Sequence, residues 1–115
     1  MKTQKEFMLL FRFEANANYQ PTEAEMAEMH QSWGNFIGEI AIQEKLVSTH
    51  QLGMEGQQIF ADMSVSEGIY VADKQTLGGN MVVRAAGMQE AVEVAKKCPI
   101  LFMGGSVEVR EIQPM

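Results

Sequence analysis

The segment from Glu6 to Phe13 constrains the fold more than any other, because it is apolar on both faces of a β-strand. Period-2 alternation separates its side chains into Phe7, Leu9, Phe11 and Phe13 on one face and Met8 and Leu10 on the other. Such a strand belongs in the middle of a sheet whose two faces are both covered. The rest of the chain, or a partner, must therefore supply two covering layers.

The order of the remaining elements predicts where one layer comes from. Thr22 followed by Glu25 is typical of a capping box, and apolar residues recur at helical spacing from there to about Glu44. The pattern then predicts strands over 46–52 and 80–86, a small hairpin over 57–60 and 63–66 inserted into the main sheet, a second helix over 88–98 ended by Pro99, and a last strand over 107–112. This order, β-α-β, inserted hairpin, β-α-β, is the ferredoxin-like split βαβ arrangement of the α+β class, in which both helices cover one face of an antiparallel sheet.

The second face of this sheet has no cover of its own, because no third layer of helices remains in the chain. A partner subunit is the simplest cover for an apolar sheet face. We therefore expect a homodimer in which two sheets pack face to face with a cavity between or beside them.

Composition excludes several classes of protein. At 115 residues with 46% hydrophobic residues, the chain is expected to fold as one domain over residues 1–115. A net charge of −6 disfavours nucleic acid as a partner. Cys98 is the only cysteine, so we expect an inert buried thiol, a reducing compartment, no metal site and no cofactor. The five apolar residues before Arg12 are too few for a signal peptide or a membrane span, so we expect a soluble cytoplasmic protein.

Strand parity selects one group of candidate ligand-binding residues. If Phe7 and its alternating neighbours face the helices, Arg12, Asn80 and Arg84 lie on the other face. Arg12 and Arg84 are expected to converge, with His50 joining them, as a cradle for the carboxylate or phosphate of a small ligand. The competing interpretation is that these arginines form ion pairs across strands with Glu14 or Glu108.

A polar, glycine-marked stretch over 67–68 and 72–79 is expected to be a long loop that borders the mouth of this pocket. Glu67, Tyr70 and Lys74 would supply it with an acid, a phenol and an amine for acid–base chemistry or for closing a cavity. The competing interpretation is that glycines set turns here while the polar groups satisfy the backbone of the loop.

The first predicted helix carries a second group of candidates. His30 lies beside the apolar stripe, and Gly34 and Gly38 follow it along the same edge. Glycine costs up to about 1 kcal/mol in a helix interior, so a strand, partner or ligand is expected to approach closely there. We consider His30 and His50 as proton-transfer groups, since imidazole exchanges protons near neutral pH, and Trp33 as a ligand contact on the helix side. His30 equally fits a purely packing role.

The second helix carries Glu90 and Glu93 early and Lys96 and Lys97 late. This order suits the helix dipole, and Glu93 with Lys97 is a favourable i,i+4 pair. The pattern predicts a solvated face and no functional site.

Motifs over nearly the whole chain resemble the YCII-related family and, within it, the DGPF-domain group. They are Met8-Leu9-Leu10, Lys45-Leu46-Val47, Val65-Ser66-Glu67-Gly68-Ile69-Tyr70, Lys74-Gln75-Thr76-Leu77-Gly78-Gly79, Glu90-Ala91, Cys98-Pro99 and Val107-Glu108-Val109-Arg110. The name-giving Asp-Gly-Pro-Phe appears here as Glu67-Gly68-Ile69-Tyr70, without the proline. The resemblance implies a dimeric α/β barrel of ferredoxin-like fold.

The resemblance also implies a set of small enzymes, a few of which use a histidine on the first helix, paired with an acid, to act on ring compounds. Aligning on Lys45-Leu46-Val47 places Trp33 where that histidine is expected, with His30 one turn earlier. We therefore expect a protein that binds a small anionic or aromatic metabolite, with acid–base chemistry on it as an open question. The alternative is a non-catalytic regulatory or protein-interaction module, transcription-associated by family association only.

Overall fold

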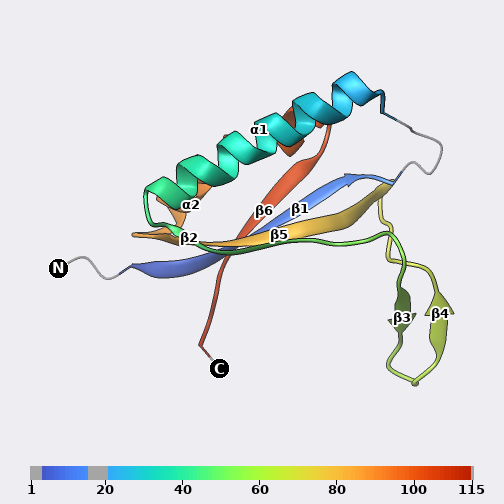
Figure 1. Ribbon diagram of the computed structural model, residues 1–115. Coiled ribbons are helices and arrows are strands. Elements are labelled where there is room, and N and C mark those ends of the chain that lie inside the picture. The colour runs from blue at the N-terminus through green and yellow to red at the C-terminus, as the bar shows by residue number, and fades with distance from the viewer. Residues whose placement is uncertain (1–3, 16–20, 115) are drawn as a thin grey trace.

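The computed structural model describes residues 4–15 and 21–114, and it forms a four-stranded antiparallel sheet with its helices on one face (Figure 1). The elements of this main layer are β1 (Lys5–Glu14), α1 (Glu23–Ile42), β2 (Leu46–Gln51), β5 (Gln75–Ala85), α2 (Met88–Ala95), the 3-10 helix η1 (Pro99–Met103) and β6 (Ser106–Glu111). The strands lie in the order β2-β5-β1-β6, and every neighbouring pair is antiparallel. This is the ferredoxin-like α+β arrangement that the element order predicts.

The core lies between the sheet and the helices. The two central strands bury Phe7, Leu9, Met81 and Val83 completely, and α1 buries Phe36 and Ile40 against them. Ala91, Ala95 and Cys98 complete this cluster from α2 and the residues after it. The parity predicted for β1 and β5 is therefore confirmed, because the predicted inward residues are the buried ones.

Helix α1 begins at the predicted capping box. The Thr22 hydroxyl accepts a hydrogen bond from the Glu25 backbone N–H at 3.1 Å, and the Glu25 carboxylate accepts one from the Thr22 N–H at 3.1 Å. Only the second half of the helix reaches the core, since Met26 is 46% exposed. Across residues 4–15 and 21–114, the structure contains no helix whose length and apolar character would let it cross a bilayer.

The predicted hairpin is present, but its predicted insertion into the main sheet is wrong, because it forms a sheet of its own. Strands β3 (Gln57–Ile59) and β4 (Val65–Glu67) pair with each other in a separate two-stranded sheet. The hairpin projects on the side of the main sheet opposite the helices (Figure 1). This projection raises the radius of gyration to 15.9 Å, above the roughly 13 Å typical of a domain this long.

The predicted loop over 72–79 is wrong in its second half, because β5 begins at Gln75 and runs through both glycines. Gly78 lies under the ring of Phe13, where a Cβ atom would overlap ring atoms. At Gly79 a Cβ atom would lie 2.7 Å from the backbone oxygen of His50. These glycines therefore allow close approach inside a strand, a role that local sequence does not distinguish from a turn.

The second helix is shorter than predicted. α2 ends at Ala95, and Cys98 precedes the 3-10 turn that begins at Pro99. Burial raises the pKa of the Cys98 thiol to about 11. The thiol is therefore protonated at neutral pH, as expected for an inert cysteine.

We predict opposite effects for alanine at two glycines. No atom from outside the local helix backbone lies within 4 Å of a Cβ placed at Gly34, so G34A should raise the free energy of unfolding by about 0.5–1 kcal/mol. G79A should lower it by about 1–3 kcal/mol, because the added methyl meets the β2 backbone. Urea denaturation at fixed protein concentration measures both, and a destabilised G34A would show that something packs on α1 there.

We also predict that Cys98 is unreactive in the folded protein. At pH 8 a thiol with a pKa near 11 forms little thiolate, and burial blocks access to it. Ellman's reagent should label it slowly in native buffer and at once in 6 M guanidinium chloride. Rapid stoichiometric labelling of the native protein would contradict the burial. Stability should also fall as the pH rises from about 9 toward 11, because the unfolded thiol ionises first.

Candidate functional site

The sheet face turned away from the helices carries the strand residues that parity predicts. At its centre Met8 of β1 lies opposite Val82 of β5 and Arg110 of β6, and Leu10 lies opposite Asn80 and Glu108. Paired residues on antiparallel strands share a face. We call this surface the open face. Its apolar centre is only partly buried, by its own neighbours.

One row of side chains crosses the open face from edge to edge. Following the register, it runs His50 on β2, Asn80 on β5, Leu10 on β1 and Glu108 on β6. Three strand spacings make this row about 14 Å wide, which leaves room for a small metabolite to lie across it. We call these residues the open-face row. Among the described residues, neither the imidazole of His50 nor the side-chain amide of Asn80 has a hydrogen-bond partner.

Arg12 belongs to this region, but its charge is already paired. Its guanidinium Nη1 lies 2.7 Å from Glu108 Oε1, and both side chains are partly exposed. The competing interpretation of Arg12, an ion pair across strands, is therefore confirmed. An ion pair this exposed adds at most about 1 kcal/mol to the free energy of unfolding. An anionic ligand would have to compete with Glu108 for the guanidinium of Arg12.

Arg84 does not converge with Arg12, so that prediction is wrong. The register places Arg84 opposite Glu6 and Arg12 opposite Leu77, which separates them by six residues along β1 or about 20 Å. Both lie on the open face, but at opposite ends of it. Adjacency of two strands follows from the fold, whereas the register along them does not. The guanidinium of Arg84 has no ion-pair partner in the described part of the chain.

Arg110 is a cation on the open face that the sequence did not single out as a candidate. It is exposed and forms no ion pair within residues 4–15 and 21–114. The signal was present in the alternation of Val107 and Val109 with Glu108 and Arg110. Both valines pack against the core, which turns the two charged residues to the open face.

The helix candidates lie on the other side of the sheet. Trp33 makes edge contacts with Phe11 and Phe36, at ring-centroid distances of 5.3 and 5.9 Å, so its ring is part of the core packing. His30 is exposed on α1. The sheet separates His30 from His50, so the two histidines of one chain cannot act on the same small substrate.

The loop candidates are not brought together by any contact among the described residues. Glu67 ends β4 and accepts a hydrogen bond from Gln57 Nε2 at 3.0 Å. The Tyr70 ring is 69% exposed, while its backbone oxygen accepts a hydrogen bond from Thr76. Lys74 occupies a left-handed turn, at φ 64°, just before β5. The hydrogen bond from Thr76 to the Tyr70 backbone oxygen fits the competing interpretation, in which polar groups satisfy the backbone of the loop.

Asp62 has a structural role in the tip of the hairpin. Its carboxylate accepts hydrogen bonds from the Ser64 hydroxyl at 2.6 Å and the Ser64 N–H at 2.9 Å. These bonds lower the pKa of Asp62 below its ordinary value, because they stabilise the charged carboxylate.

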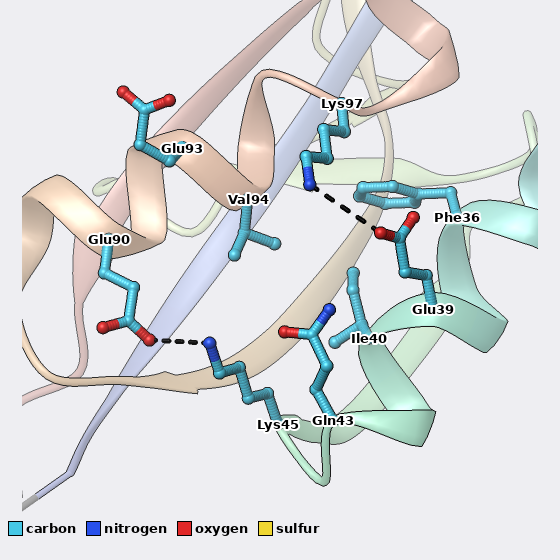
Figure 2. Close-up of a pocket in the computed structure, with 9 residues that line it drawn as sticks. All are labelled: Phe36, Glu39, Ile40, Gln43, Lys45, Glu90, Glu93, Val94 and Lys97. Carbon is cyan, nitrogen blue, oxygen red and sulfur yellow. Dashed lines mark ion pairs between the residues drawn. The ribbon is translucent and has the colours of Figure 1, made fainter.

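A pocket of about 200 Å³ lies between α1 and α2, with Phe36, Ile40 and Val94 among its lining residues (Figure 2). Two ion pairs flank it, Lys45 with Glu90 at 2.8 Å and Lys97 with Glu39 at 3.7 Å (Figure 2). Each pair joins the α1 side of the pocket to the α2 side.

These contacts correct the prediction for the second helix, because Lys97 pairs across the pocket with Glu39 while Glu93 pairs with Lys96 at 3.2 Å. Lys45 and Lys97, the two cations that line the pocket, are thus both occupied by carboxylates of the chain. The two ion pairs hold the two sides of the pocket together, and this favours a structural role for the pocket over ligand binding.

A wider groove of about 660 Å³ lies between α1 and η1. None of the predicted site residues lines either cavity. The described residues also contain no group of three or more His, Cys, Asp or Glu side chains placed to hold a metal ion. The open-face row therefore gathers more of the predicted site residues than either cavity does.

Comparison with known proteins identifies the family of the chain. No curated protein matches the sequence significantly. The family model of the YCII-related domain matches residues 6–115, which is nearly the whole chain. The chain therefore belongs to the YCII-related family.

Proposed function

We propose that this protein is a cytoplasmic homodimer that binds a small aromatic or anionic metabolite between the open faces of its two sheets. One observation carries the proposal. The open face combines an uncovered apolar centre with two neighbouring polar side chains, His50 and Asn80, that have no partner among the described residues.

The dimer follows from the apolar centre. Met8, Leu10 and Val82 lie in adjacent positions on the two middle strands, on the face that no helix covers (Figure 1). Full burial of an exposed side chain of this kind contributes about 1.5–3 kcal/mol, and because these three are already partly buried, covering the rest of each contributes part of that. A second copy offers the same three side chains, and an isologous contact between identical faces is the commonest way to cover such a patch.

The chemistry of the open-face row favours an aromatic ligand over a simple anion. Leu10 gives a flat apolar floor, and His50 and Asn80 offer hydrogen bonds to a ring substituent. Arg12 is held by Glu108, so an anion must compete with a carboxylate of the protein. His50 is the proton-transfer group of this site, if the bound molecule is also a substrate.

The alternative function is a non-catalytic interaction module. The exposed apolar side chains of the hairpin favour it, with Ile59 and Met63 at 72% and 81% exposure. In this case the open face would be filled by packing and would bind no small molecule. A net charge of −6 argues that the partner is a protein and not a nucleic acid.

The dimer is tested by a charge on the open face. L10E should convert the protein from a dimer to a monomer of 12.8 kDa, because two carboxylates would be buried at the contact. Light scattering at micromolar protein measures the mass. I42E is the matched control, because Ile42 is 85% exposed at the end of α1 and should leave the dimer intact. A monomeric wild-type protein would overturn the proposal.

The ligand site is tested by thermal shift with ring probes, catechol as the neutral one and benzoate as the anionic one. A probe at ten times its Kd stabilises the native state by about 1.4 kcal/mol and raises the Tm. H50Q should abolish the shift, while H30Q should retain it, because His30 lies on the other side of the sheet. If no ring compound shifts the wild-type Tm, or if H50Q binds as well as wild type, the open-face row is not the binding site.

A further inference from the structure

The segment between β2 and β5, residues 52–74, is an acidic and apolar arm. It carries four carboxylates, Glu55, Asp62, Glu67 and Asp73, and one cation, Lys74. Its hairpin projects beyond the open face, away from the helices (Figure 1). We call this segment the hairpin arm.

The hairpin arm needs a surface to pack on. Its strands β3 and β4 pair only with each other among the described strands, and each is three residues long. A two-stranded hairpin is marginally stable at best in water. Several of its large apolar side chains are more than half exposed: Met54, Ile59, Met63, Val65 and Tyr70.

The opposite end of the open face is positively charged. Arg84 lies there directly opposite Glu6, and Arg110 lies two residues nearer the centre, opposite Met8, so this part of the open face holds two guanidiniums and one carboxylate. Neither guanidinium has an ion pair within the described ranges. We call this group the arginine end.

The hairpin arm cannot reach the arginine end of its own chain. The arm joins β5 at Gln75, and Arg84 lies nine residues further along that strand, about 30 Å away. The arm also points away from the sheet and does not fold back along it (Figure 1). Two stacked sheets lie only about 10 Å apart, so an arm that projects from one sheet reaches past the other.

Charge decides between the two simple ways to stack identical open faces. A twofold axis parallel to the strands brings arm to arm and arginine end to arginine end, which places like charges together. A twofold axis across the strands brings each arm to the arginine end of the other copy. Like charges opposite one another are unfavourable, and complementary patches fix the orientation of an interface.

We propose that two copies stack with their strands reversed, so that the hairpin arm of each copy packs on the arginine end of the other. The inference rests on the proposed homodimer and adds its orientation. In this arrangement the open-face row lies between the two arms, and each arm closes one end of the space around it.

Charge reversal tests the orientation. Analytical ultracentrifugation in 50 mM NaCl should show at least tenfold weaker dimerisation for E55K/E67K and for R84E/R110E, each alone. An equimolar mixture of the two variants should form a heterodimer within threefold of the wild-type Kd, because both arm contacts then join opposite charges. In 500 mM NaCl the difference between variants and wild type should shrink severalfold, since exposed charges are screened.

The matched control changes the same net charge on the helix side. E23K/E28K alters two exposed α1 carboxylates and should dimerise as wild type does. Circular dichroism confirms that each variant is folded. A dimeric wild type with E55K/E67K unchanged, or a mixture that is not restored, overturns the orientation and leaves the homodimer standing. A monomeric wild type overturns both.

Discussion

Burying one face of β1 leaves the molecule with a second apolar face that its own helices do not reach. Phe7 and Leu9 are fully buried under α1 and α2, and the chain has used both helices in doing so. Met8 and Leu10 alternate with them and must face the other way. The open face, its row of polar side chains and the case for a second copy all follow from this alternation.

Ion pairing then separates the charged side chains by role. Arg12 with Glu108 and Lys97 with Glu39 are satisfied within the chain, which makes them parts of the scaffold. Arg84 has no such partner among the described residues, although its residue type and its face are those of Arg12. A charged group becomes a candidate for recognition when the fold supplies no internal counterion.

Much of the fold was predictable because it depends on local patterns. The capping box at Thr22 begins α1 as expected, and the alternation in β1 and β6 assigns each side chain to its face. The order of elements then leaves few topologies to consider. The glycines at 78 and 79 were misread because a strand glycine is recognised by what crosses over it, here Phe13 and the β2 backbone.

The sequence by itself determined the elements, the two faces of the sheet and the presence of uncovered apolar surface, because each depends on residues near one another in the chain. Only the tertiary structure decided which of those residues meet. The strand register places Arg84 about 20 Å from Arg12, and it places Asn80 beside His50. The packing of the helices brings Lys97 into an ion pair with Glu39. A shift of two residues along a strand keeps every side chain on its face but changes every neighbour, so alternation alone cannot specify a site.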